Sequence, residues 1–326
     1  MFEISVIGCG EIANSFHAPS LLKYREQYPD TVLLGCCDSD KSKAEDFAKR
    51  FGFKTAHDDY REMLRDRCPN AVCLYTSYPV IPKIASDVMQ MGIPVLMEKP
   101  PGTTTDEVSL IAESAKKHDV INQVAFNRRF APAMGRLKQW LQSAAEGIHN
   151  IRCVFQRVSR ADSNFFTTAI HGIDAVRHIA GSDYREVRFR YYELPDVNKG
   201  AANIYMDCAM ESGATAQLAF LPHVGAVSEK YYVSCLNNDF ELSMPVWGSP
   251  EYPGGLWHYK GNKIAEHMEG HVFGDGMFEN FGFFAENAFF LDTVKSGGKN
   301  PHDIVSAKQS VEVAHCIEKR LEVYTK

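Results

Sequence analysis

The sequence lacks the features that mark several classes of protein. It contains no run of about 20 apolar residues, the length that a membrane-spanning helix needs. Lys and Arg are not gathered into a basic run, and the formal net charge of −6 gives no electrostatic reason to expect nucleic acid as a partner. The nine cysteines form neither a C-x-x-C pair nor a regular framework, which is typical of a reducing compartment. There is no internal repeat or low-complexity tract. These absences favour a globular protein that binds small molecules.

The composition is otherwise ordinary. A hydrophobic fraction of 45% can supply a sizeable core, and a length of 326 residues suggests two domains. The N-terminal stretch MFEISVIGCGEIA carries Glu3 and lacks the basic start and long apolar run of a signal peptide. We therefore expect a cytoplasmic protein.

The first part of the chain, up to about residue 125, alternates short β-rich runs with amphipathic helical segments. Apolar strands separated by helices predict a parallel sheet covered on both faces, which is a doubly wound α/β domain. Asp40 is placed to cap a helix at its start, and Gly52 follows the end of that helix. The predicted strands are ISVIG, TVLLGCCD, NAVCLYT, IPVLMEK and VINQVAF, and the predicted helices include 41–50, 59–67 and 105–117.

The rhythm changes after a predicted linking helix at 131–145. Strand-like runs then follow one another with short turns such as ESGA and NND between them, which favours an antiparallel sheet. These runs are IRCVFQRVS, EVRFRYYEL, ANIYMDCAM, TAQLAFL, KYYVSCL and DFELSM. Two later segments, 278–296 and 303–325, are predicted to be helical. The sequence thus predicts an α/β domain over 1–125, followed by an α+β domain over 126–326.

A glycine motif follows the first predicted strand. VIGCGEIA places Gly8, Gly10 and Ala13 in the spacing G-x-G-x-x-A where a helix begins. A dinucleotide site needs one glycine for the tight turn, a second with no Cβ where the pyrophosphate approaches, and a small residue for packing. Amides at the helix start, including those of Glu11 and Ile12, then hold the anion. A plain strand-to-helix turn is the alternative, but the position in a predicted βαβ unit favours dinucleotide binding.

The second predicted strand ends in GCCDSD, which brings Asp38 and Ser39 to the cofactor edge of the sheet. A carboxylate here accepts the hydroxyls of the adenosine ribose and repels a 2′-phosphate, so Asp38 favours NAD over NADP. Ser39 and Lys41 lie close enough in the sequence for some use of NADP. The alternative role of Asp38 is that of a simple turn former.

Glu98 and Lys99 end the fifth apolar run, in VLMEKPPG. They therefore lie at the carboxyl end of a parallel strand, the edge where doubly wound folds bind ligands. The prolines that follow prevent a helix from starting at once and stiffen the turn. The alternative is an exposed Glu-Lys pair of no consequence. The loop after the preceding strand should face the cofactor with Thr76, Ser77 and Tyr78.

The segment AIHGIDAVRHIAG, residues 169–181, places three titratable side chains in a mostly apolar helix. His171, Asp174 and His178 are spaced three and four apart, so they project from one stripe and can act on one ligand. Burial of such groups is costly unless each has a partner. The stripe could bind a metal, relay a proton or consist of hydrogen-bonded core residues.

Taken together, the motifs make the chain resemble one family over nearly its whole length. The glycine turn, the Glu98-Lys99-Pro100 triplet, FNRRFAP at 126–132 and HGIDAVRH at 171–178 resemble the glucose–fructose oxidoreductase / inositol dehydrogenase / MocA family. The resemblance implies an N-terminal Rossmann domain that binds NAD or NADP. It also implies a C-terminal α+β domain whose large, mainly antiparallel open sheet supports a homo-oligomer, and a cis peptide bond between Lys99 and Pro100.

By the same resemblance, Lys99 is the catalytic lysine, and Asp174 and His178 are the paired acid and histidine. The implied reaction transfers a hydride between the nicotinamide and a carbinol or carbonyl carbon of a sugar, polyol or related small molecule. His178 would accept the hydroxyl proton, Lys99 would stabilise the developing alkoxide, and Asp174 would orient His178 or bind a neighbouring hydroxyl. The candidate substrate contacts are His171, Asn127 and Arg129, with an ion pair or a cap as the alternative for the last two.

Two features depart from the family pattern. After the fourth predicted strand the chain reads TSYPVIP, where the family commonly has a Pro-Asn-x-x-His-like segment, and PPG replaces the usual Pro-Leu-Ala after the lysine. A metal hydrolase built on the helical stripe would leave the glycine turn, Asp38 and Lys99 unexplained, so we expect no metal. Two alternatives stay open: a dinucleotide-binding sensor without turnover, and an enzyme that oxidises a sugar transiently to eliminate a substituent or cleave a glycoside.

Overall fold

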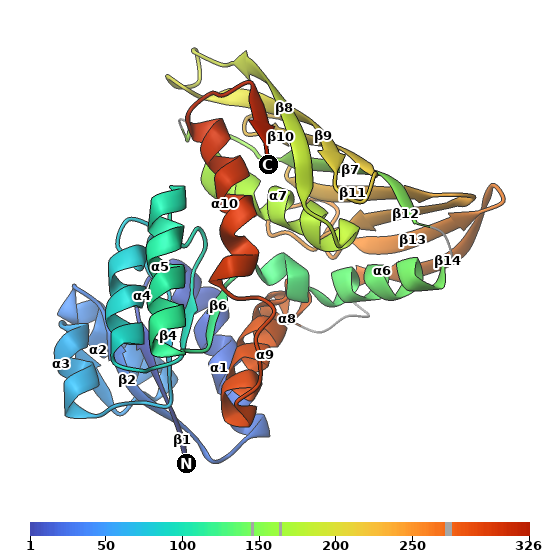
Figure 1. The fold of residues 1–326 in the computed structure, drawn as a ribbon. Coiled ribbons are helices and arrows are strands. Elements are labelled where there is room, and N and C mark those ends of the chain that lie inside the picture. Colours follow the sequence, from blue (N-terminus) through green and yellow to red (C-terminus); the bar gives the residue numbers. More distant parts are fainter. Residues whose placement is uncertain (145–146, 163–164, 271–275) are drawn as a thin grey trace. The chain divides into compact units, whose positions relative to one another are not determined.

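The computed structural model describes residues 1–144, 147–162, 165–270 and 276–326 (Figure 1). The chain divides into two compact units. The first comprises Met1–Asn127 and Phe283–Lys308, and the second comprises Arg128–Gly282 and Gln309–Lys326. The first boundary falls close to the predicted one, whereas no pattern in the sequence had assigned 283–308 to the first unit.

The first unit contains a six-stranded sheet in which every pair of neighbouring strands is parallel. The strand order is β3-β2-β1-β4-β5-β6, as in a doubly wound fold, so the predicted fold class is confirmed. The strands are β1 (Phe2–Ile7), β2 (Thr31–Cys37), β3 (Thr55–His57), β4 (Ala71–Leu74), β5 (Val95–Met97) and β6 (Asn122–Val124). The five predicted strands correspond to β1, β2, β4, β5 and β6, and the short strand β3 was missed.

The helices of this unit begin and end largely where the sequence signals lie. They are η1 (Ala13–His17), α1 (Ala18–Gln27), α2 (Lys41–Phe51), α3 (Tyr60–Asp66), α4 (Ile81–Gln90), α5 (Thr105–His118) and α9 (Phe283–Ser296). The Asp40 side chain accepts the Ser42 N–H at the start of α2, and Gly52 ends that helix with φ 77°. Both predicted caps are therefore confirmed. The η1 segment is a π-helical turn, and it leads directly into α1.

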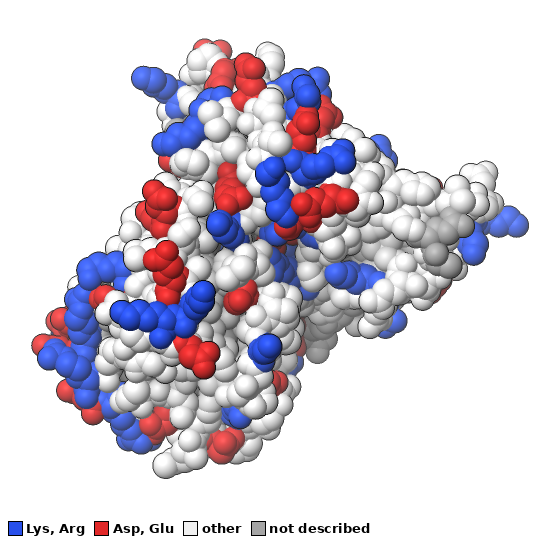
Figure 2. Space-filling model, viewed as in Figure 1, with Lys and Arg blue, Asp and Glu red and all other residues white. Residues whose placement is uncertain are grey.

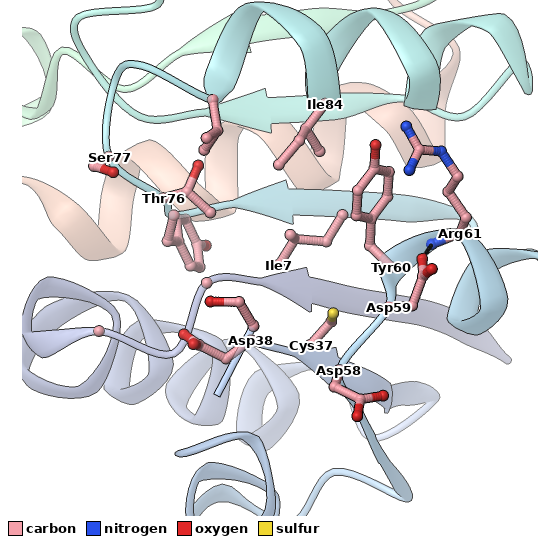
Figure 3. Close-up of a pocket in the computed structure, with 15 residues that line it drawn as sticks. Ile7, Cys37, Asp38, Asp58, Asp59, Tyr60, Arg61, Thr76, Ser77 and Ile84 are labelled. Atoms are coloured by element: carbon pink, nitrogen blue, oxygen red, sulfur yellow. Dashed lines mark hydrogen bonds between the residues drawn. The ribbon is translucent and has the colours of Figure 1, made fainter. Parts of the chain in front are cut away.

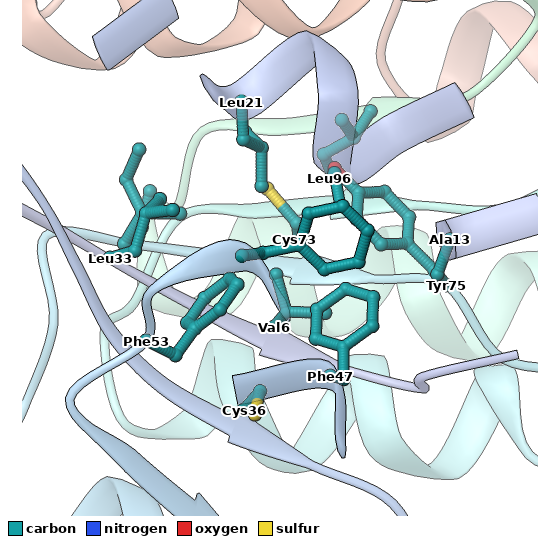
Figure 4. Close-up of a cluster of buried hydrophobic side chains, with 14 of the residues drawn as sticks. Val6, Ala13, Leu21, Leu33, Cys36, Phe47, Phe53, Cys73, Tyr75 and Leu96 are labelled. Atoms are coloured by element: carbon teal, nitrogen blue, oxygen red, sulfur yellow. The ribbon is translucent and has the colours of Figure 1, made fainter. Parts of the chain in front are cut away.

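A hydrophobic cluster joins this sheet to its helices (Figure 4). Val6 and Leu33 come from the strands, Leu21 and Phe47 come from α1 and α2, and Phe290 comes from α9, which is far away in the sequence. All five are at most 2% exposed. Full burial of one such side chain contributes about 1.5–3 kcal/mol, so the cluster holds α9 to the same sheet as α1 and α2.

The second unit contains a nine-stranded sheet, β14-β13-β12-β11-β7-β10-β9-β8-β15 (Figure 1). Among the described strands of this sheet only the β7–β10 pair is parallel, so the prediction of a large, mainly antiparallel sheet is confirmed. The strands are β7 (Ile148–Gln156), β8 (Tyr184–Glu193), β9 (Ala202–Met210), β10 (Thr215–Leu221), β11 (Ser228–Cys235), β12 (Asn238–Ser243), β13 (Gly255–Lys260), β14 (Lys263–Glu269) and β15 (Val323–Thr325).

One face of this sheet is covered by α7 (Phe166–Ala180), which packs against β7 and β10. The approach is close at Gly172, where an added Cβ would lie 2.6 Å from the Phe220 ring. The other face is open, and residues of the two faces alternate along β9, where Tyr205 and Asp207 are exposed and their neighbours are buried. The remaining helices that the structure describes here are η2 (Asn127–Phe130), α6 (Pro132–Ser143), α8 (Met277–Asn280) and α10 (Ile304–Glu318), and the first and last of these have residues in both units.

Three predictions about helices differ from the structure. The predicted helix 303–325 is wrong at its end, because α10 stops at Glu318 and β15 pairs with β8. The predicted helix 278–296 is two helices, α8 and α9, with Gly282 at φ 89° between them. The predicted helix 131–145 matches α6, and its last residue, Ala145, lies outside the described residues.

Two observations concern the charged surface and the helices of the part of the chain that is described. On the face shown in Figure 2, basic and acidic side chains are interspersed, with no continuous basic tract. Among the described residues, no helix is both long and apolar enough to cross a membrane.

Candidate active site

The glycine turn after β1 has the geometry that a tight strand-to-helix connection requires. Gly8 has φ +100°, and an added Cβ would lie 2.6 Å from the carbonyl oxygen of Tyr75. The Gly8 N–H donates to the Cys37 carbonyl at 2.8 Å, which ties the turn to the end of β2. Only glycine fits this position, because both the backbone angle and the lack of space exclude a side chain.

Gly10, unlike Gly8, has open space where a side chain would lie. An added Cβ would meet nothing within 4 Å, and the residue is exposed. The helix begins at the next residue, so Glu11 and Ile12, both exposed, lie in its first turn. An anion can therefore approach the backbone over Gly10 and reach the amides of the helix start, and the turn fits a pyrophosphate.

Asp38 is held in place by two backbone amides. Its Oδ2 accepts the Cys9 N–H of the glycine turn at 2.9 Å, and its Oδ1 accepts the Asp40 N–H at 3.0 Å. The carboxylate is partly buried, and Ser39 next to it is exposed. The hydrogen bond from Cys9 fixes the distance between the Asp38 carboxylate and the glycine turn. A dinucleotide site needs such a fixed distance, because the pyrophosphate binds at the turn and the adenosine ribose at the carboxylate.

The turn and Asp38 line one cavity of about 570 Å³ (Figure 3). The cavity joins Gly8, Gly10, Asp38, Ser39, Thr76 and Ser77, all predicted as cofactor contacts. Thr76 Oγ1 is buried and has no hydrogen-bond partner among the described residues, as expected where a polar ligand group completes the site. Tyr78, Glu11, Ile12, Glu98 and Lys99 are the predicted cofactor residues that do not line this cavity.

The far wall of the cavity was missed by the sequence analysis. It comes from the residues that follow β3, and Asp59 there caps α3 by accepting the Arg61 N–H at 2.7 Å. With Asp38, the two acidic residues of this wall give the cavity three carboxylates beside Arg61, whose guanidinium donates to Asp87. Carboxylates favour a ribose with free hydroxyls over a 2′-phosphate. The signal available in the sequence was the segment DDY, residues 58–60, which directly follows the unrecognised strand β3. The missed lining residues are Ile7, Cys37, Asp58, Asp59, Tyr60, Arg61, Tyr75, Val80 and Ile84.

Glu98 and Lys99 follow β5 and differ in their surroundings. Glu98 is buried, and its Oε1 lies 2.7 Å from Nε2 of the buried His17. Burial alone would raise the pKa of Glu98, but the hydrogen bond from His17, with the charge and the backbone N–H of Lys99, holds that pKa below its usual range. Lys99 is half-buried, and the expected cis peptide bond between Lys99 and Pro100 is confirmed. The loop that follows β5 and carries Lys99 is called the lysine loop. Glu98 thus supports the lysine loop from within the first unit.

In the second unit, α7 carries the predicted stripe, and the structure shows what two of its members contact. Asp174 Oδ2 accepts from Arg129 Nε at 2.7 Å, and its Oδ1 accepts from Arg129 Nη2 at 2.6 Å and from Ser310 Oγ at 2.8 Å. Burial by itself would raise the pKa of Asp174, but the charge and hydrogen bonds of Arg129 outweigh it and hold that pKa below its usual value. Asp174 is therefore an ionised carboxylate, and both of its oxygens accept hydrogen bonds. His178 is half-buried, and its carbonyl accepts from Lys138 Nζ at 2.8 Å.

His171 belongs to a buried charge network that the sequence analysis missed. Its Nε2 lies 3.0 Å from Arg128 Nη1, and Arg128 also donates to both oxygens of Glu229. Arg157 donates to the same carboxylate. Burial raises the pKa of Glu229, and the two arginines more than reverse that effect, so its pKa is lowered. No local pattern in FNRRFAP distinguishes Arg128, which pairs with Glu229 and His171, from Arg129, which pairs with Asp174.

Two further predictions concern Asn127 and metal binding. Asn127 is buried and is the last residue of the first segment of the first unit. Within the described residues, no group of three or more His, Cys, Asp or Glu side chains is arranged to hold a metal ion. The side chains of His171 and Asp174 contact arginines instead.

Comparison with known proteins gives the first unit its family. Residues 2–126 match the GFO_IDH_MocA family model, which describes an oxidoreductase family with an NAD-binding Rossmann fold. Over these residues the chain is similar to that family. The match confirms the resemblance carried by the motifs, and it covers the turn, Asp38 and the lysine loop.

Relatives and solved structures of this family extend the comparison. A myo-inositol 2-dehydrogenase from Thermotoga maritima is 25% identical over 57% of this chain and 57% of its own length. A levoglucosan dehydrogenase from Pseudarthrobacter phenanthrenivorans is 26% identical over 54% of this chain and 46% of its own length. The chain thus aligns with about half the length of these relatives. A Gfo/Idh/MocA family oxidoreductase from Vibrio cholerae has the same fold, with a TM-score of 0.81, 21% identity and 98% of both chains covered.

Proposed function

We propose that the protein is an NAD-dependent dehydrogenase that acts on a CH–OH group of a sugar, polyol or related small molecule. The observation that carries this proposal is the cavity at the glycine turn. There, Gly10 leaves the backbone open to an anion, and the turn itself holds the Asp38 carboxylate through the Cys9 amide. The three carboxylates of the cavity support NAD as the preferred dinucleotide, with NADP as a weaker ligand.

The lysine loop supports a polar role for Lys99 at the reacting oxygen. Oxidation of an alcohol makes the oxygen more negative as the C–H bond breaks, and a positioned cation stabilises that charge. Lys99 follows β5 at the carboxyl edge of the parallel sheet and is only half-buried, while Glu98 is anchored in the interior beside it. We assign to Lys99 the donation of a hydrogen bond to the substrate oxygen.

The helix α7 supplies the proposed base. His178 takes the hydroxyl proton, since an imidazole has an ordinary pKa close to neutrality and the other histidine of the stripe, His171, already contacts Arg128. Asp174 keeps its negative charge because Arg129 pairs with both of its oxygens. His171 braces the helix through Arg128. The bound dinucleotide supplies the hydride acceptor. A substrate contact through Asn127 or Arg129 stays a prediction.

The substrate class follows from the names of the relatives. Myo-inositol and levoglucosan both present secondary alcohols on a six-membered ring, and the relatives named for them align with 57% and 54% of this chain. We therefore propose a cyclic polyol or pyranoside as the substrate.

The test is single-turnover NADH formation with NAD and a panel of sugars and polyols that includes myo-inositol and levoglucosan. The wild type is compared with Lys99→Met and with the control Lys116→Met, which removes an exposed lysine from α5. We expect NADH from the wild type and the control and none from Lys99→Met.

Other outcomes separate the alternatives. Cleavage of a glycoside with no accumulation of NADH identifies transient oxidation. Tight NAD binding with no reaction of any panel compound, in the wild type or either variant, favours a sensor. Failure of the wild type to bind any dinucleotide refutes the proposal as a whole.

We also propose that the open face of the nine-stranded sheet binds a second copy of the chain. The strand registers align a row of side chains across this face, in which two aromatic rings lie toward one end and charged or amide groups make up the rest. Arg152 lies 4.9 Å from the Tyr232 ring, and Tyr205 on β9 is 36% exposed. Mixed aromatic and polar surfaces of this kind are typical of interfaces. Light scattering on the purified protein tests it, and a monomer at micromolar concentration contradicts it. The row consists of Trp257, Glu241, Tyr232, Arg152, Gln217, Asp207 and Arg188.

A cytoplasmic location is proposed on the state of the thiols. None of the nine cysteines forms a disulfide, and eight of them are buried, so the fold does not depend on oxidation. Cell fractionation checks this, and recovery of the protein outside the cytoplasmic fraction contradicts it.

A further inference from the structure

His17 is a buried imidazole that the proposed mechanism does not use. It ends the π-helical turn η1, is 0% exposed, and stacks on the ring of Tyr75 with centroids 3.8 Å apart. The ring of Phe283 meets it edge-on at 5.0 Å. Both ring nitrogens have a polar partner: Nε2 lies 2.7 Å from Glu98 Oε1, and Nδ1 lies 3.0 Å from Asn287 Nδ2. The ring is therefore held on its faces and at both nitrogens.

The contacts of Asn287 decide which nitrogen of His17 carries the proton. Asn287 Nδ2 donates to the Phe283 carbonyl at 2.8 Å, and Asn287 Oδ1 accepts from the Tyr75 hydroxyl. Burial raises the pKa of Tyr75 well above its ordinary value, so this hydroxyl keeps its proton and donates. The amide nitrogen of Asn287 therefore faces His17, whose Nδ1 accepts and whose Nε2–H donates to Glu98.

Glu98 connects the hydrogen bonds of His17 to the lysine loop. Its Oε1 accepts from His17, and its Oε2 accepts the backbone N–H of Lys99 at 3.0 Å. The hydrogen bonds thus form one chain that runs from Tyr75 through Asn287 and His17 to Glu98 and ends at the Lys99 peptide. All the donors and acceptors belong to the first unit.

A contribution to stability alone does not account for this series of hydrogen bonds. Side chains from the π-turn, the end of β4, the end of β5 and α9 meet in the interior, where well-packed apolar groups would be as stabilising as a buried polar network. Buried networks in which every member is satisfied hold one geometry, and this one ends at the peptide of the residue to which we assign the reaction. Such a network is useful behind a reacting group, where it holds that group in its productive geometry.

We propose that His17 and Asn287 are positioning residues for Lys99, which they orient through the carboxylate of Glu98. The role of Lys99 in hydride transfer rests on the proposed function. The orientation of its loop does not, so the two can be tested apart.

The experiment compares His17→Leu, Asn287→Leu and His17→Gln in the full-length chain. The leucines fill the space and remove the hydrogen bonds, while the glutamine amide can still donate to Glu98. Asn122→Leu is the matched control: Asn122 is also a buried amide of the first unit, 6% exposed, and it bonds to Val120 and Ile304 rather than to Glu98.

Two readouts are used. The first is kcat, KM and the NAD dissociation constant with whichever panel compound reacts. The second needs no substrate: it is the acetylation rate of Lys99 by an amine-reactive reagent, measured by peptide mass spectrometry relative to that of the exposed Lys116 in the same molecule.

We expect His17→Leu and Asn287→Leu to lower kcat roughly 10- to 100-fold, the scale of a displacement of about 1 Å at a reacting group. NAD affinity should stay close to that of the wild type, and the Lys99 to Lys116 labelling ratio should change several-fold. His17→Gln should restore most of both. Asn122→Leu should lose stability without changing either.

The proposal is overturned if the leucine variants match Asn122→Leu in kcat and in the labelling ratio, or if His17→Gln fails to restore them. If His17→Leu does not fold, Asn287→Leu gives the same comparison without a change at His17. If the wild type turns over no compound, hydride transfer fails as the proposed function, and the labelling ratio still decides whether the network orients Lys99.

Discussion

Alanine at either glycine of the first turn should have opposite consequences, because the two glycines serve different needs. At Gly8, φ is +100° and the new Cβ would lie 2.6 Å from the Tyr75 carbonyl oxygen and 2.9 Å from Thr76 Cγ2. At Gly10, the Cβ would meet nothing within 4 Å. We expect Gly8→Ala to destabilise the fold and Gly10→Ala to weaken NAD binding in an otherwise unchanged protein.

The magnitudes follow from these contacts. A left-handed backbone angle costs a residue with a Cβ about 1–2 kcal/mol, and forcing an extra carbon against the backbone costs about 1–3 kcal/mol. Gly8→Ala should therefore lower the free energy of unfolding by about 2–5 kcal/mol, a large share of the total for a typical protein. Gly10→Ala should change it by no more than about 0.5 kcal/mol, as at other exposed positions.

The effect on the cofactor should be reversed. The Cβ of Gly10→Ala occupies the space over which the pyrophosphate approaches the helix start, and a clash of about 1–3 kcal/mol corresponds to roughly 5- to 150-fold weaker NAD binding. Denaturant unfolding without dinucleotide measures the first quantity, and calorimetric titration with NAD measures the second. The reasoning is refuted if Gly10→Ala binds NAD as tightly as the wild type, or if Gly8→Ala unfolds at the wild-type denaturant concentration.

Three further predictions concern charged groups. Asp38→Asn should weaken NAD binding about 10-fold through loss of a charged hydrogen-bond acceptor and should tighten NADP binding; paired titrations measure the ratio, and an unchanged ratio contradicts the assignment. Arg129→Met should lower the free energy of unfolding by about 3–5 kcal/mol, because it leaves the carboxylate of Asp174 buried without its partner; adding Asp174→Asn should recover much of the loss, and additive losses in denaturant unfolding would argue against the pair. Asp174 and Glu229 have lowered pKa values, so their contribution to stability is present above the unfolded-state value of about 4 and is lost as the pH falls through the lower folded-state values; the melting temperature should fall steeply on acidification below about pH 4, and less steeply in Glu229→Gln, and identical slopes would disprove the link.

The sequence predicted the parts of the site that depend on local chemistry. The glycine spacing, Asp38 after β2 and the lysine loop after β5 each combine a residue type with a position at the end of a strand, and parallel strands end at one edge of a sheet. The sequence did not predict the wall formed by Asp58, Asp59 and Tyr60. The strand before it, β3, has only three residues, too few for a periodicity to stand out.

The sequence could not predict which charged residues become partners. FNRRFAP places two arginines side by side, and long-range packing sends Arg128 to Glu229 and Arg129 to Asp174. The same holds for His17, whose partner Asn287 lies 270 residues away in the sequence and reaches it because α9 packs on the sheet of the first unit. Such pairs depend on contacts between distant segments, for which a local pattern carries no information.

At the end of the chain, too, the local sequence pattern predicts one structure and tertiary pairing produces another. The segment 303–325 has the composition of a helix throughout, yet the helix stops at Glu318 and Val323–Thr325 becomes an edge strand, because β8 offers an unpaired edge there. By itself, the sequence determined the two kinds of fold and the glycine turn, since these follow from periodicity and backbone chemistry. The tertiary structure alone decided which carboxylates are paired and which amides and imidazoles lie beside them, because buried charges and amides acquire their state from the partners that packing brings to them.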